Sequence, residues 1–125
     1  MGAYLYKVMA LAARSDGNVD TYEKQILGSY LRYNRELLSM SDIEIKSARN
    51  DLESQNEEAI IKDLSENLSN EQKEKAYALA MEVCSINFQI LPLEAEFLEK
   101  IRTKFGISAK VDRSLTVSRK LRYGF

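Results

Sequence analysis

The fold of this chain is decided by one stretch, Asp16-Gly17-Asn18-Val19-Asp20-Thr21-Tyr22-Glu23. An apolar run with helical spacing comes before it, and a second one follows it. Gly17 is able to adopt the positive φ that ends a helix, and Asp20 and Glu23 have the spacing of a capping box that starts the next one. The stretch therefore predicts a helix, a polar turn and a second helix.

A weaker copy of this stretch lies 71 residues later, as Asn87-Phe88-Gln89-Ile90-Leu91-Pro92-Leu93-Glu94. The same shift aligns Val19 with Ile90 and Glu23 with Glu94, and the flanking apolar positions also coincide. Two helical hairpins that face one another bury both long helices in one core. We therefore expect an all-α fold, a single compact helical domain of two pseudo-repeated helical hairpins plus connecting helices.

Periodicity and capping signals place the other helices. Ser41 with Glu44 predicts a helix start, a break is expected at 54–56, and Ser69 with Gln72 predicts another start. The expected ranges are 3–14, 20–35, 41–53, 57–68, 70–86 and 92–105. Pro92 is the first residue of the final core helix, and Gly106 terminates it. The helix over 70–86 is apolar most of the way round, so we expect it at the centre of the core.

The chain divides by charge into a helical domain at 1–109 and a basic C-terminal tail at 110–125. The tail has five cationic residues against Asp112, although the chain as a whole has a net charge of −1. We expect the tail, as a short amphipathic helix or an extended arm, to lie against its own domain or a neighbouring copy through Leu115, Val117 and Leu121. The alternative is attraction to anionic lipid or nucleic acid.

Composition excludes several kinds of chemistry. The chain has no histidine, which removes Ser-His-Asp catalysis and histidine zinc sites, and its single cysteine, Cys84, excludes an internal disulfide. No apolar run approaches the 18 residues that a transmembrane helix requires, and the N-terminus has no secretory pattern. We expect a cytoplasmic protein with no transmembrane segment and no specific nucleic-acid partner.

The residues from Ala12 to Glu23, Ala-Ala-Arg-Ser-Asp-Gly-Asn-Val-Asp-Thr-Tyr-Glu, resemble the signature of the TerB-like domain family. This family includes the bacterial tellurite-resistance protein TerB and the N-terminal domain of the co-chaperone DjlA. The resemblance covers residues 3–107 and implies an all-α domain that carries the signature in both halves. The second half departs from the pattern, because Asn87-Phe88 stands where Asp-Gly is expected.

Polar residues of the two turns form the candidate site. Asp16, Asn18 and Asp20 alternate as in the opening of an EF-hand loop, but Thr21 and Leu27 occupy the positions of the EF-hand glycine and bidentate glutamate. Helix capping is the alternative explanation of the same residues. The candidate acidic patch consists of Asp16, Asn18, Asp20, Glu23, Asn87 and Glu94. We expect Asp16, Asp20, Glu23 and Glu94 to converge on one exposed surface where the two hairpins meet. A weak Ca²⁺ or Mg²⁺ site would use Asp16, Asp20, Glu23 and Glu94, and otherwise we expect no cofactor.

These observations favour a non-enzymatic binding or adaptor module with a protein partner. The resemblance connects it with a bacterial stress response such as tellurite resistance. The alternative is a small divalent-metal-binding or carboxylate-based catalytic protein that uses the acidic turn. Glycine-rich phosphate loops and clustered cysteines, which would indicate other chemistry, are absent from the sequence.

The capping hypothesis for Asp20 gives the first prediction. Asp20→Ala removes the side-chain acceptor for an exposed backbone N–H, so unfolding in urea should show a loss of about 1 kcal/mol in stability. Asp20→Asn keeps an acceptor and serves as the control. Equal stability of the alanine variant and the parent protein would contradict the capping box.

Overall fold

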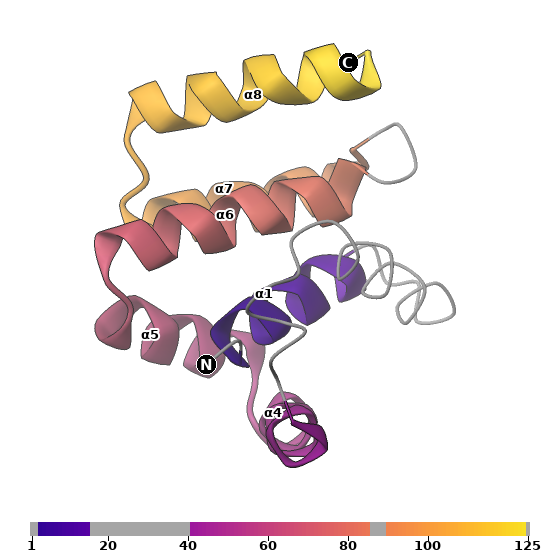
Figure 1. Ribbon diagram of the computed structural model, residues 1–125, viewed down its shortest axis with the longest axis vertical. Helices are drawn as coiled ribbons and strands as arrows, with labels where there is room; N and C mark the ends of the chain where they lie inside the picture. The colour runs from indigo at the N-terminus through magenta and orange to yellow at the C-terminus, as the bar shows by residue number, and fades with distance from the viewer. Residues whose placement is uncertain (1–2, 16–40, 86–89, 125) are drawn as a thin grey trace.

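The computed structural model describes residues 3–15, 41–85 and 90–124. Their regular structure is helical throughout, which confirms the all-α class for this part of the chain (Figure 1). The helices are α1 (Ala3–Arg14), α4 (Asp42–Ser54), α5 (Glu57–Asn67), α6 (Asn70–Ser85), α7 (Pro92–Phe105) and α8 (Ala109–Tyr123). The helix expected over 20–35 and the two polar turns fall largely outside these residues, so the pseudo-repeat stays a prediction.

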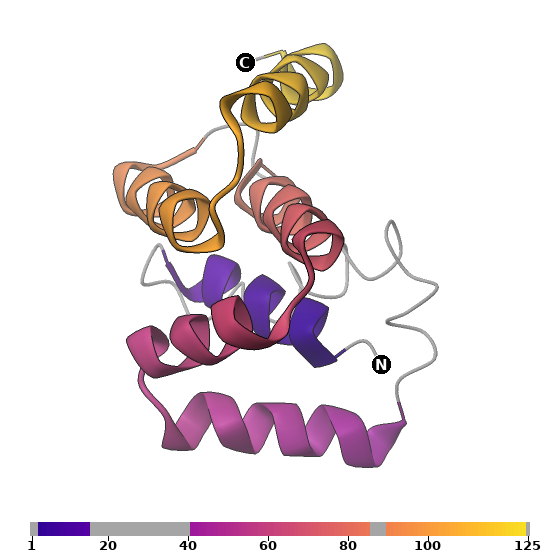
Figure 2. The same ribbon diagram turned by 90° about the vertical axis from the view of Figure 1, so that its left-hand side faces the viewer.

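The described helices lie in tiers along the longest axis of the molecule. In both views α8 occupies one end and α4 the other, with α6 and α7 next to α8 and with α1 and α5 next to α4 (Figures 1 and 2). None of the described helices is long and apolar enough to cross a membrane.

The core is built around the pair α1 and α6, which pack more extensively against each other than any other two described helices. Ala10, Ala12 and Ala13 are buried and add little bulk to the C-terminal half of α1, so the backbone of a neighbouring helix can approach closely. From Ala76 to Ser85, α6 is buried at all positions except Ala78, which confirms the expected central helix. Burial of these apolar side chains is the main term that stabilises the fold.

Local capping decides where several helices begin and end. The Glu44 N–H donates to Ser41 Oγ over 3.2 Å and the Ser41 N–H donates to Glu44 Oε1 over 3.4 Å, which confirms the expected capping box. Ser69 and Gln72 make the same reciprocal pair at the start of α6. Gly106 ends α7 at φ 64°, a conformation that strongly favours glycine.

The tail forms α8, which lies along α6 and is held at both ends by polar contacts. Tyr77 Oη donates to Asp112 Oδ1 at the first turn over 2.5 Å. At the last turn Arg122 and Tyr123 donate to the carboxylate of Glu82, which is only 3% exposed; the Arg122 Nη2 to Glu82 Oε2 distance is 2.9 Å. A buried carboxylate needs such donors, because burial without them is strongly unfavourable.

Of the three residues expected to attach the tail, one packs against the core. Leu115 packs against the core, but Val117 is 57% and Leu121 is 83% exposed. In an extended arm residues 115 and 117 share a face, whereas in a helix two residues apart point in nearly opposite directions. Because the tail is a helix, Leu115 faces inward and the other two face outward.

The contact between Glu82 and α8 gives a prediction for stability. Arg122→Met should lower the free energy of unfolding by about 1–3 kcal/mol, because Glu82 stays buried with one donor fewer. In a Glu82→Gln background the same substitution should cost less, and a double-mutant cycle in urea measures the difference. Lys120→Met, an exposed neighbour, is the control and should change stability by less than about 0.5 kcal/mol. Equal effects of Arg122→Met in both backgrounds would contradict the coupling.

Candidate functional site

Glu94 alone among the six acidic-patch residues lies in the described part of the chain. It is 4% exposed, and its Oε1 accepts the Leu91 N–H over 2.9 Å, so it caps the first turn of α7 from inside the fold. The expectation of an exposed Glu94 is therefore wrong. Asp16, Asn18, Asp20, Glu23 and Asn87 lie outside the described residues, so the acidic patch and its metal site stay predictions.

The structure places a groove directly before the predicted acidic turn, at the C-terminal end of α1. We name it the Arg14 groove. Its volume is about 290 Å³, and it is lined by Arg14, Ser15, Glu57, Leu93, Glu96, Phe97 and Lys100. A smaller hollow of about 120 Å³ adjoins it and shares Arg14, Ser15 and Glu57. The last turn of α1 thus separates two depressions, one toward α7 and one toward α4.

Three helices fix the positions of the groove residues. The Ser15 hydroxyl donates to the Ala12 carbonyl over 2.6 Å and closes the end of α1, which carries Arg14. No carboxylate among the described residues forms an ion pair with Arg14. On α7, Leu93 is 55% exposed while Phe97 is buried, so an apolar surface lies beside this cation.

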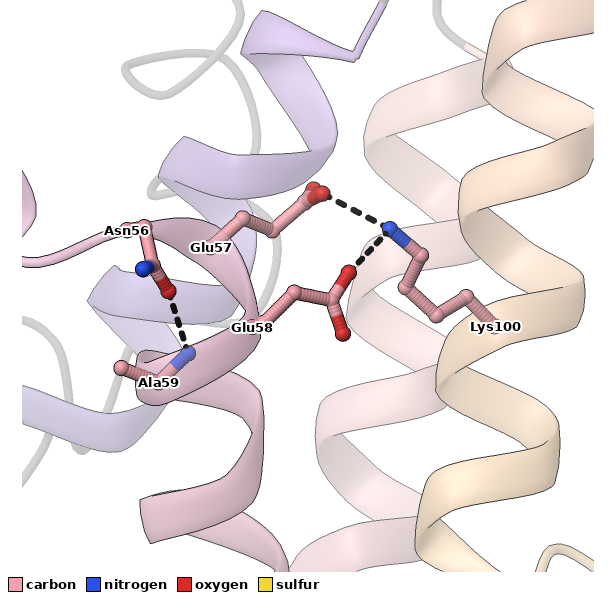
Figure 3. Close-up of polar contacts among 5 residues, drawn as sticks. All are labelled: Asn56, Glu57, Glu58, Ala59 and Lys100. Atoms are coloured by element: carbon pink, nitrogen blue, oxygen red, sulfur yellow. Dashed lines mark hydrogen bonds and ion pairs between the residues drawn. The ribbon is translucent and has the colours of Figure 1, made fainter.

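An ion-pair network of Glu57, Glu58 and Lys100 closes the groove on the side of α5. Asn56 caps this helix, since its Oδ1 accepts the Ala59 N–H over 2.8 Å. The cap points Glu57 and Glu58 toward α7, where Lys100 Nζ lies 2.9 Å from Glu57 Oε2 and 2.8 Å from Glu58 Oε1 (Figure 3). Both acids also stand in the first turn of α5, where the helix dipole favours negative charge.

The ion pair favours the charged forms of Glu58 and Lys100. The hydrogen bond from Lys100 lowers the pKa of Glu58, and the bonds to Glu58 and Glu57 raise the pKa of Lys100. A lysine that acts as a nucleophile or a base needs a lowered pKa. Lys100 is therefore suited to holding α5 against α7.

A second hollow, of about 350 Å³, lies between α6, α7 and α8. Its polar rim includes Asp112 and its apolar lining includes Met81 and Leu98. Burial and the bond to Asp112 raise the pKa of Tyr77, which stands in the same wall, so this phenol keeps its proton and donates to the carboxylate. Tyr77 and Asp112 thus hold α8 in place, and their polar groups are engaged with each other.

No family model matches this chain, and neither a curated protein nor a solved structure is significantly similar to it. The resemblance to TerB-like domains thus rests on the motif from Ala12 to Glu23 alone. In residues 3–15, 41–85 and 90–124, no three Asp, Glu or Cys side chains are grouped as a metal site would require.

Sequence reasoning missed the residues that define the described surfaces. Arg14 stands inside the quoted motif, next to the acidic turn, and its cationic side chain had no expected role. Glu82 interrupts the apolar run from Ala76 to Cys84, and such an acid inside a buried face indicates a distant partner. The pairing of Lys100 with Glu57 and Glu58 spans more than 40 residues and leaves no local signal.

The pKa directions at Lys100 give a prediction for pH dependence. The pKa of Glu58 is depressed in the folded state, so its pairing stabilises the fold above the ordinary pKa of 4.5 and is lost as the pH falls through the lowered value. The pKa of Lys100 is raised in the folded state. Its contribution to stability is therefore fully present below the ordinary pKa of 10.5 and is lost as the pH rises through the raised value. Lys100→Met should therefore lower the urea midpoint near neutral pH, and the difference should shrink in acid.

Lys62→Met is the matched control, because Lys62 is an exposed lysine of α5 without a described ion pair. Its effect should be smaller and should lack the acid dependence. A Lys100→Met difference that is equally large at pH 7 and at pH 3 would contradict the assigned pairing.

Proposed function

We propose that the protein is a non-enzymatic binding module whose Arg14 groove engages a segment of a protein partner. The observation that carries this proposal is the position of Arg14, a cation without an ion pair among the described residues, beside the exposed Leu93. Such a surface suits a segment with an acidic side chain next to an apolar one. The groove also adjoins the turn on which the TerB-like resemblance rests, so we place the module in a bacterial stress response such as tellurite resistance.

The chemistry of the groove supports binding over catalysis. Lys100 has a raised pKa and is engaged by two carboxylates, so it lacks the free electron pair of a nucleophile. Glu57 is engaged by Lys100, which leaves Glu96 as the exposed carboxylate of the groove. A lone exposed carboxylate in water is a poor general acid near neutral pH.

Site-specific photo-crosslinking in the native cell tests the proposal. A benzophenone side chain at position 93 should give a discrete adduct with one protein, and Arg14→Glu should abolish that adduct. The same probe at Lys104, exposed near the end of the same helix, should not give it. Adducts that are identical at the two positions, or that survive Arg14→Glu, would overturn the proposal.

Titration calorimetry with Ca²⁺, Mg²⁺ and Zn²⁺ distinguishes this function from the metal-binding alternative. We expect weak binding at best, because Asn87 stands where a second acid is expected. Tight binding that Asp16→Asn abolishes and Arg14→Glu leaves intact would instead favour the acidic turn as a metal site.

A further inference from the structure

The molecule carries opposite charges at the two ends of its longest axis. One end is α8, with five cationic residues against one carboxylate. Toward the other end lie α4 and α5, which hold eight carboxylates against three cationic residues. Three of these carboxylates, Asp51, Glu57 and Glu58, pair with Lys7 or Lys100 of other helices, so the excess of negative charge is smaller than the count of the two helices alone. Figures 1 and 2 both show α8 and α4 at opposite extremes of the long axis.

The outward side of α8 forms a basic face. Its exposed members include three cations, Lys110, Arg113 and Lys120, and the apolar pair Val117 and Leu121, which share a side of the helix at i, i+4 spacing. It has no exposed carboxylate, since the single acid of α8, Asp112, accepts a hydrogen bond from Tyr77. Tyr77 and Glu82 fasten α8 at both ends, so this face is a fixed surface.

The opposite end, which we name the acidic end, combines exposed carboxylates with an exposed apolar residue. Ile43 on α4 is 81% exposed, and Glu53 is exposed on the same helix. Asp63 and Glu66 are exposed on α5. The exposed charged residues of α4 and α5 are five carboxylates and three cations, so this end has a net negative charge. The two ends of the molecule thus have opposite net charges, and each exposes apolar surface, Val117 and Leu121 at one end and Ile43 at the other.

We propose that copies of this chain associate head to tail, the basic face of one copy docking on the acidic end of the next. Charge complementarity favours this pairing, since like ends repel and unlike ends attract. Because the two surfaces point in opposite directions along the long axis, docking leaves one free surface of each kind. Such a heterologous contact builds open chains rather than a closed dimer.

A second copy fits the basic face better than a lipid surface does. Helices that lie in a membrane interface present a broad apolar side, and α8 exposes two large apolar residues. A 15-residue helix is about 22 Å long, so one face of it buries far less than the roughly 800 Å² per partner of a stable interface. The association is therefore weak and needs a high protein concentration to be populated.

Sedimentation of the full chain at rising concentration tests the association. In about 0.01 M salt the average mass should rise with concentration above the monomer mass of 14.3 kDa, and in about 1 M salt it should return toward it, because the Debye length falls from about 30 Å to about 3 Å. An average mass that stays monomeric at all concentrations in low salt would overturn the proposal. The proposal would be equally wrong if the protein stayed monomeric but bound anionic phospholipid vesicles.

Variants blocked at one end make the test specific. Val117→Glu with Leu121→Glu blocks the basic face, and Ile43→Lys with Glu53→Lys blocks the acidic end; all four side chains are exposed, so circular dichroism should report an unchanged fold. Each variant alone should stay monomeric, whereas an equimolar mixture should form dimers and no larger species.

Lys104→Glu, which changes the net charge as much as the first variant but lies on α7, should associate like the parent protein. A mixture that stays monomeric, or single variants that still associate, would overturn the head-to-tail arrangement.

Discussion

The close packing of α1 against α6 is the constraint on which the rest of the described structure depends. The buried alanines of α1 take up little space, and α6 is buried over most of its length, so these two helices occupy the centre. Two helices in such contact leave apolar surface on both flanks, which α7 covers on one side and α4 on the other. The remaining helices lie where that surface still needs cover, and this explains the tiers along the long axis.

The outer helices contribute few buried apolar residues, and polar contacts fix their orientation. Ala48 and Leu52 are the buried residues of α4, and α8 has none. Arg49 Nε donates to Tyr6 Oη over 3.0 Å, and Lys7 lies 2.9 Å from Asp51, so α4 is tied to α1 by two polar links. Links of this kind add modestly to stability. They fix the rotation of α4 about its own axis, which its few apolar contacts alone leave poorly specified.

The contrast between a central apolar helix pair and outer helices held by polar contacts explains which features the sequence predicts. The starts of α4 and α6 were predictable, because a cap and its partner lie three residues apart and leave a local signal. The inward side of α8 was not, because Asp112 and Arg122 meet partners 35 and 40 residues away. The burial of Glu94 was missed for a related reason. Its capping contact with the Leu91 N–H is local, but whether that contact faces solvent or the core depends on packing between distant helices.

The same contacts determine which solution conditions act on the described surfaces. The chain has no histidine, so no side chain has an ordinary pKa in the range between the carboxylates and cysteine. The shifts at Glu58, Lys100 and Tyr77 all move their pKa values further from neutrality. The cause is the ion pair at Glu58 and Lys100, whereas at Tyr77 it is burial together with the hydrogen bond to Asp112. Exposed charges interact through solvent that contains salt, so ionic strength rather than pH controls how strongly these surfaces attract a partner.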